Sequence, residues 1–153
     1  MKKIIFLDVD GTIVDYDNHI PDSAKIAIQQ SRKNGHLVFL CTGRSKAEMS
    51  NEILDIGFDG IIGGNGSYIE YKNQVLMHQL IPYETAKQVV YWLESRGLEF
   101  YLESNNGLFA SRNFRDAARQ ILRIYALGKG ASENQILNME PEDALHGLVY
   151  GGE

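Results

Sequence analysis

The chain has 153 residues, enough for one ordinary domain with a sizeable hydrophobic core. Hydrophobic residues make up 44% of it and charged residues 23%, as in most soluble globular proteins. The net charge of -5 excludes the basic footprint of proteins that bind nucleic acid or anionic membranes, but leaves a small anionic ligand open.

The chain also lacks the sequence signs of secretion. Cys41 is its one cysteine and cannot form an internal disulfide, so a reducing compartment is the default. The apolar run that follows Met1-Lys2-Lys3 breaks at Asp8, too early for a signal peptide or a membrane span. We therefore expect a cytoplasmic protein that binds neither membrane nor nucleic acid.

The first half of the chain alternates short apolar runs with amphipathic segments. The run 4–7 (IIFL) is apolar on both faces, which favours a strand buried on both sides. It is followed by an expected helix over 21–35, a strand over 37–41 (LVFLC), a helix over 45–57 and a strand over 60–62. This alternation predicts a parallel sheet with crossover helices.

The pattern changes after Gly66. We expect a hairpin of 67–71 and 74–81, a helix over 83–96, strands over 98–103 and 108–111, a helix from 114 to about 128, and short strands over 135–139 and 148–150. A boundary near Pro82 would therefore divide an α/β part, residues 1–81, from a smaller α+β part, residues 82–153.

Compact polar residues follow each of the three strands expected in the first part. In an open parallel sheet, ligands bind beyond the carboxyl ends of the strands. The residues at these ends are Asp8 and Asp10 (DVDGT), Thr42, Gly43 and Arg44 (CTGRS), and Asn65 and Gly66 (GGNGS). We expect all three groups to converge on one crevice.

Two carboxylates two residues apart repel each other unless a cation offsets their charge. Mg²⁺ prefers carboxylate oxygens, keeps several waters and is completed by a phosphate, so Asp8 and Asp10 are candidate metal ligands. With the metal bound, Asp8 could attack phosphorus and form an aspartyl-phosphate. Asp10 could then act as general acid towards the leaving group and as base towards water.

The neighbouring residues suit the recognition of phosphate. Gly11 lets the chain turn sharply, and Thr12 offers a hydroxyl and an N–H to phosphate oxygens. The Thr42 hydroxyl and the Gly43 N–H could hold an oxygen that is not transferred, while Arg44 could clamp an anionic group.

An apolar strand followed by DVDGT, a strand ending in TGR, and NG after a third strand together resemble the haloacid dehalogenase (HAD) superfamily. The spacing and the α+β segment that follows resemble its Cof-type sugar-phosphate phosphatases, in which a type IIB cap is inserted at this point. The resemblance implies a Rossmann-like parallel sheet with an α+β cap, and Mg²⁺-dependent hydrolysis of a small phosphorylated metabolite. It implies that Asp8 is the nucleophile, Asp10 the acid/base and Thr42 the hydroxyl of the second motif.

The sequence departs from the family pattern after the cap. Family members carry a later Lys that neutralises the phosphate and a later GDxxxD motif that completes the metal site. The chain has no Gly-Asp dipeptide, and Lys129, its one lysine after Lys87, lies in the cap region. We therefore expect an incomplete core and a partial cap, a chain truncated before the second half of the core.

In that family the first strand is central, so an incomplete core would leave residues 4–7 as an apolar edge open to self-association. Two alternatives to a phosphatase stay open. One is a binding or interaction module derived from this fold, without turnover. The other is a phosphoacceptor receiver domain, which needs a further strand-end Asp after Ile61-Ile62.

Overall fold

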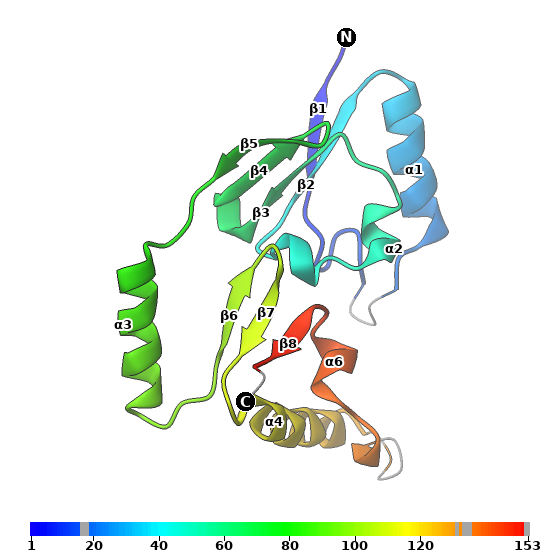
Figure 1. Cartoon of the computed structure of the whole chain (residues 1–153). Helices are drawn as coiled ribbons and strands as arrows, with labels where there is room; N and C mark the ends of the chain where they lie inside the picture. Colours follow the sequence, from blue (N-terminus) through cyan, green and yellow to red (C-terminus); the bar gives the residue numbers. More distant parts are fainter. Residues whose placement is uncertain (16–18, 131, 133–135, 152–153) are drawn as a thin grey trace. The chain divides into compact units, whose positions relative to one another are not determined.

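The structure is a computed structural model that describes residues 1–15, 19–130, 132 and 136–151 (Figure 1). The chain divides into two compact units, Met1–Leu80 and Ile81–Glu153, next to the boundary expected near Pro82. No helix in the described ranges is long and apolar enough to cross a membrane.

The first unit is built on a five-stranded sheet of order β1-β2-β3-β4-β5. Its strands are β1 (Ile4–Leu7), β2 (Leu37–Cys41), β3 (Gly60–Gly63), β4 (Tyr68–Tyr71) and β5 (Gln74–His78). The first three are parallel, as predicted, and β4 and β5 add an antiparallel hairpin. The hairpin turns at Lys72 and Asn73, whose φ angles of 49° and 62° are the two positive values that a two-residue type I′ turn requires.

The core of this unit lies on one face of the sheet, under α1 (Asp22–Lys33) and α2 (Asn51–Leu54) (Figure 1). Ile28 of α1 and Ile53 of α2 pack there against Val38 and Leu40 of β2. Leu40 is fully buried. Burial of these side chains is the main favourable contribution to folding of the unit.

The prediction that the strand over 4–7 is buried on both faces is wrong. Ile4 and Phe6 are 57% and 55% exposed, whereas Ile5 and Leu7 pack against the core. Successive side chains of a strand point to opposite faces, and the helices of this unit cover only one of them. An apolar run does not reveal whether both faces have a cover.

The helix predicted over 45–57 is also wrong in its extent. A short 3₁₀ helix, η1 (Lys46–Glu48), comes first, then an extended break at Met49 and Ser50, and then the four residues of α2. Met49, 2% exposed, turns into the core at the break. Burial of the Met49 side chain is more favourable than continuing the helix, so the first helix stops and a new one starts after Ser50.

Asp59, just before β3, links the beginning of β3 to the beginning of β2. Its carboxylate accepts hydrogen bonds from the Val38 N–H at 2.8 Å and from Arg32 of α1 at 3.2 and 3.3 Å. Burial opposes the charged form, but these donors outweigh burial and hold the pKa of Asp59 below its usual value.

Asp59→Asn should therefore lower the free energy of unfolding at pH 7 by about 1–3 kcal/mol. Since the pKa is depressed in the folded state, the stabilisation is present above the unfolded-state pKa and is lost as the pH falls through the folded-state value. Urea unfolding of both proteins should give a difference that shrinks below about pH 4. Asp55→Asn, at an exposed position, is the control; an Asp59 effect independent of pH would contradict this assignment.

The second unit contains a three-stranded sheet of order β6-β7-β8. Its elements are α3 (Tyr83–Glu94), β6 (Tyr101–Ser104), β7 (Gly107–Ala110), α4 (Phe114–Gly128), α6 (Pro141–Ala144) and β8 (Leu148–Tyr150). β6 and β7 are antiparallel, and β7 pairs with β8 in parallel. Arg119 of α4 binds Glu140, just before α6, at 2.7 and 3.0 Å.

The strand predicted over 135–139 is wrong for the residues of that segment that the structure describes. Residue 135 lies outside the described residues, but Ile136 and Leu137 are helical and Asn138 is in a turn. Ile136 is 7% exposed, so its side chain is buried from a helical turn instead of from a strand. A short apolar stretch does not distinguish the two by its pattern alone.

Candidate active site

The first candidate residues lie in a tight turn directly after β1. The Val9 carbonyl accepts hydrogen bonds from the N–H groups of Thr12, Ile13 and Val14, at 3.3, 3.0 and 2.9 Å. Val9 itself is fully buried, which anchors the turn, and Gly11 adopts a φ of 71° that favours glycine. Asp8 and Asp10, on either side of Val9, are both exposed.

This turn occupies the Thr12 N–H, which was expected to bind phosphate, and the N–H of the neighbouring Gly11. The Thr12 N–H donates to Val9, and the Gly11 N–H donates to the Val14 carbonyl at 2.8 Å. The Thr12 hydroxyl is therefore the better candidate for contact with a phosphate, and Gly11 contributes through its backbone conformation.

The second group follows β2 at the same edge of the sheet, because the parallel register pairs Leu7 with Leu40. Thr42 is 6% exposed, and its N–H donates to the Ile62 carbonyl of β3 at 2.9 Å. Its hydroxyl oxygen accepts a hydrogen bond from the Arg44 N–H at 3.2 Å. Hydrogen bonds therefore fix both the backbone N–H and the hydroxyl of Thr42. Gly43, the next residue, is exposed.

Arg44 connects the first two groups. Its guanidinium binds the Asp10 carboxylate through two hydrogen bonds, Nη2 to Oδ1 at 2.5 Å and Nε to Oδ2 at 3.1 Å. This two-point geometry is the one that guanidinium also uses to bind phosphate. The Arg44 carbonyl accepts from the Gly64 N–H at 2.9 Å, so its backbone is fixed against the loop after β3.

The third group, Asn65 and Gly66, lies in η2 (Gly64–Gly66) after β3. Asn65 adopts a left-handed conformation, with a φ of 52°, and its side chain lies against Gly43. A Cβ at position 43 would lie 3.2 Å from Asn65 Oδ1, so glycine permits this close approach. Gly66 also has a positive φ, 89°, and contributes to the turn through its backbone.

The sequence analysis missed a polar cluster in which Lys46 meets the buried side chains of Tyr68 and Glu70. Lys46 of η1 binds Glu70 of β4 at 2.7 Å, and the Tyr68 hydroxyl donates to the same carboxylate. Burial opposes the charge of Glu70, but Lys46 and Tyr68 hold its pKa below the usual value; burial and Glu70 together raise the pKa of Tyr68 to about 12. This cluster fastens the segment after Arg44 to the sheet, and the acidic Glu70 within the strand YIEY was its one signal in the sequence.

The donor set is compatible with Mg²⁺. Within the part of the chain that the structure describes, no three His, Cys, Asp or Glu side chains are grouped to hold a metal. However, Mg²⁺ needs only one or two carboxylates when a substrate phosphate and waters complete its shell, and Asp8 and Asp10 supply those. The Asp10 carboxylate binds Arg44 in this structure, so it would have to be shared or released for a metal.

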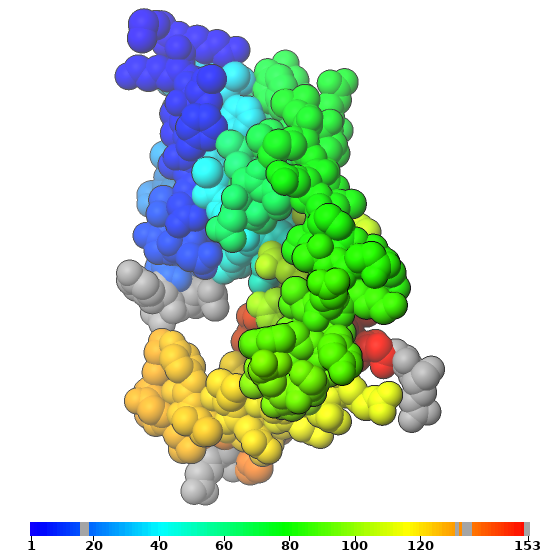
Figure 2. Space-filling model, turned by 90° about the vertical axis from the view of Figure 1, so that its left-hand side faces the viewer, coloured from blue at the N-terminus to red at the C-terminus, as the bar shows by residue number. Residues whose placement is uncertain are grey.

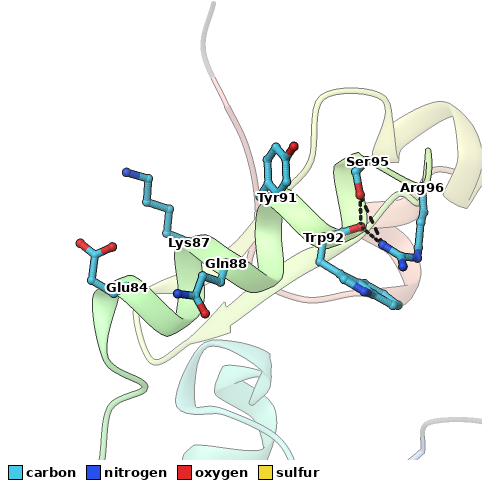
Figure 3. Close-up of a pocket in the computed structure, with 7 residues that line it drawn as sticks. All are labelled: Glu84, Lys87, Gln88, Tyr91, Trp92, Ser95 and Arg96. Carbon is cyan, nitrogen blue, oxygen red and sulfur yellow. Dashed lines mark hydrogen bonds between the residues drawn. The ribbon is translucent and has the colours of Figure 1, made fainter.

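The second unit has a hollow of its own along α3 (Figure 3). It measures about 440 Å³ and is lined by Glu84, Lys87, Gln88, Tyr91, Trp92, Ser95 and Arg96, all from one helix or its end. Arg96 stacks on the Trp92 ring at 3.9 Å, which accounts for its orientation. None of the predicted site residues lines this hollow, and we assign no role to it.

The fold and the candidate site define an α/β protein with paired carboxylates and anion-binding groups at the carboxyl ends of its parallel strands. The family model that matches, over residues 5–146, is that of the haloacid dehalogenase-like hydrolases. Since this match covers most of the chain, the protein belongs to that family, and the resemblance carried by DVDGT, TGR and NG is confirmed.

Individual relatives agree with this assignment. YkrA of Bacillus subtilis, a phosphatase by name, is 32% identical over 89 residues, which are 58% of this chain and 35% of YkrA. A solved HAD subclass IIB sugar phosphatase, BT4131, is 30% identical with a TM-score of 0.59, covering 72% of this chain and 44% of its own. A hypothetical protein of Geobacillus kaustophilus shares the fold, with a TM-score of 0.72 at 23% identity over 92% of this chain and 55% of its own. The chain thus spans about a third to a half of the lengths of these relatives.

Proposed function

We propose that the chain is the nucleophile-bearing part of a Mg²⁺-dependent phosphatase that acts on a small phosphorylated metabolite. The observation that carries this proposal is the Arg44–Asp10 pair, which joins the DVDGT and TGR loops at the edge where Asp8 and Asn65 also lie. A paired acid beside an exposed nucleophile, with a guanidinium that can bind phosphate, is suited to phosphoryl transfer.

In this proposal Asp8 attacks the phosphorus atom, the bond to the leaving oxygen breaks, and an aspartyl-phosphate forms on Asp8. Asp10 gives a proton to the leaving group and then removes one from the water that hydrolyses the intermediate. Arg44, Thr42 and the Gly43 N–H bind the phosphate oxygens. Mg²⁺, held by Asp8 and Asp10, would supply the positive charge that the two carboxylates and the phosphate need.

The substrate we propose is a sugar phosphate. The support is the similarity to the sugar phosphatase BT4131, together with a second unit that begins directly after β5. We propose that residues 1–81 are part of the catalytic core and residues 82–153 part of a cap that selects the substrate. The single cysteine supports a cytoplasmic location for the reaction.

The alternative is a module that binds a phosphorylated ligand without turnover. It is favoured by the two hydrogen bonds between Arg44 and Asp10, which engage the carboxylate that turnover would need as acid and base. Retention of Mg²⁺ and inorganic phosphate by this chain, without hydrolysis by the chain or by any longer protein that contains it, would favour this alternative.

Phosphate release from p-nitrophenyl phosphate and from a panel of sugar phosphates tests the proposal. It should be measured with this chain and with any longer protein that contains it. We expect turnover with Mg²⁺ and a fall of at least about 100-fold when EDTA removes the metal. Readdition of Mg²⁺ should restore the rate. Turnover that is unchanged by EDTA would contradict the metal-dependent mechanism.

A further inference from the structure

The Arg44 guanidinium is held at a third point, by the short helix that follows it. Besides its two contacts with Asp10, the guanidinium donates from Nη1 to the Glu48 carbonyl at 3.4 Å. Glu48 is the last residue of η1, and its carboxylate accepts from the Ser45 N–H at 3.3 Å, just before the helix begins. The direction of the guanidinium therefore depends on where η1 lies.

The contact that ties η1 itself to the sheet is an ion pair. None of the three residues of η1 is buried, although Ser45 and Met49 on either side of it are. Lys46 binds the Glu70 carboxylate at 2.7 Å. A cavity of about 230 Å³, which both of these side chains line, lies beside the contact, so packing does not hold Lys46 on every side. The position of η1 between its two buried neighbours therefore depends on the ion pair.

The sheet places Glu70 for this contact. Figure 2 shows the strands of the first unit side by side in chain order, from dark blue to green, so that β4 is separated from β2 by β3. Lys46, which follows β2, thus meets a residue on the far side of β3. The Tyr68 hydroxyl, on the same face of β4, donates to the same carboxylate. Although burial opposes the charge, Lys46 and Tyr68 hold the pKa of Glu70 below its usual value, so the acid is charged at neutral pH.

We propose that Glu70 and Lys46 are positioning residues, which hold the Arg44 guanidinium through η1 in the orientation that binds the phosphate of the substrate. What Arg44 binds rests on the phosphatase function proposed above, whereas how Arg44 is held does not. Loss of the Glu70 charge would let η1 shift, and the Glu48 carbonyl would shift with it. Arg44 would then spend less time in its two-point geometry, so phosphate binding should weaken while the chemical step changes little.

The orientation of Arg44 can be measured without turnover, as the exchange of its Nε–H proton with water in the NMR spectrum of this chain. This proton is donated to Asp10, so it should exchange slowly, and its signal is the one that Arg44→Lys removes. Glu70→Gln keeps the shape of the side chain without its charge and should speed the exchange at least about five-fold. Lys46→Met, at a partly exposed position, should do the same, whereas Lys46→Arg, which keeps the charge, should stay within about two-fold of the unsubstituted protein.

Glu52→Gln is the matched control. Glu52 binds Lys25 at 3.1 Å, so this substitution also removes the acid of an ion pair in the first unit, but at an exposed site between α1 and α2. Exchange of the Arg44 Nε–H should change less than about two-fold in this variant. Circular dichroism should show that the variants at Glu70, Lys46 and Glu52 are all folded.

Steady-state kinetics test the effect on phosphate binding, in this chain or in a longer protein that contains it, with p-nitrophenyl phosphate. Glu70→Gln should raise KM at least about five-fold and change kcat less than about two-fold. In an Arg44→Ala background the same substitution should change KM less than about two-fold, because the residue through which it acts is gone. A merely structural role would instead lower activity equally in both backgrounds.

Faster exchange in Glu70→Gln and Lys46→Met but not in Glu52→Gln, with an effect on KM that needs Arg44, supports the proposal. Unchanged exchange in both variants would overturn it, even in a protein that proves to be a phosphatase. An equal rise of KM with and without Arg44 would overturn it as well. Faster exchange, with no turnover by this chain or by a longer protein that contains it, would count against the phosphatase function and still support the positioning of Arg44.

Discussion

Asp8→Asn is expected to lower phosphate release by at least about 1,000-fold, in this chain or in any longer protein that contains it. An amide is a far weaker nucleophile than a carboxylate, and the substitution also removes a negative charge that Mg²⁺ needs. The rate of phosphate release under saturating p-nitrophenyl phosphate and Mg²⁺ is the measurement.

The fold should survive this substitution. Asp8 is exposed, and the turn that follows it is held by the backbone of Val9, not by the Asp8 carboxylate. Circular dichroism and the melting temperature should therefore match those of the unsubstituted protein. Asp55→Asn, at an exposed position beyond α2, is the matched control and should retain activity. Undiminished turnover in Asp8→Asn would rule out Asp8 as the nucleophile.

Arg44→Ala is expected to lower kcat/KM by about 100-fold or more, with a large part of the loss in KM. The guanidinium contacts Asp10 at two points, and in the proposed reaction it turns to the phosphate. Arg44→Lys should recover only part of the loss, because an ammonium cannot form the two-point contact. Steady-state kinetics on one sugar phosphate would measure all three proteins.

Lys33→Ala removes a positive charge at the exposed end of α1 and serves as the control, with kcat/KM expected to change little. If Arg44→Ala and Lys33→Ala behaved alike, the Arg44–Asp10 pair would be a surface ion pair without a catalytic role. A loss confined to kcat, with KM unchanged, would place Arg44 with the acid/base step and not with phosphate binding.

The elements with strong local patterns could be predicted from the sequence. The run LVFLC and the amphipathic face of residues 114–128 correspond to β2 and α4 within a residue or so. The segment 45–57 did not follow its pattern, because Met49 is drawn into the core and interrupts the helix. The exposure of Ile4 and Phe6 on one face of the sheet could not be predicted from the residues of β1, because it depends on what covers that face.

Part of the candidate site could also be predicted from the sequence. DVDGT, TGR and NG each follow a strand, and the parallel register brings their ends to one edge. The direct contact between Arg44 and Asp10 is a tertiary detail that spacing could not supply. The Lys46–Glu70–Tyr68 cluster joins residues far apart in the sequence, so no local motif announces it.

In the proposed mechanism, Asp8 carries the phosphoryl group during turnover. Mass spectrometry tests this in the Asp10→Asn variant, quenched with acid after incubation with Mg²⁺ and p-nitrophenyl phosphate, whose leaving group needs no proton from Asp10. Without the Asp10 base the second step should slow, and the phosphoryl group should accumulate on Asp8. Peptide mapping should locate it there, and it should be absent from the variant that also carries Asp8→Asn. A phosphoryl group on another residue, or turnover with none on Asp8, would contradict the mechanism.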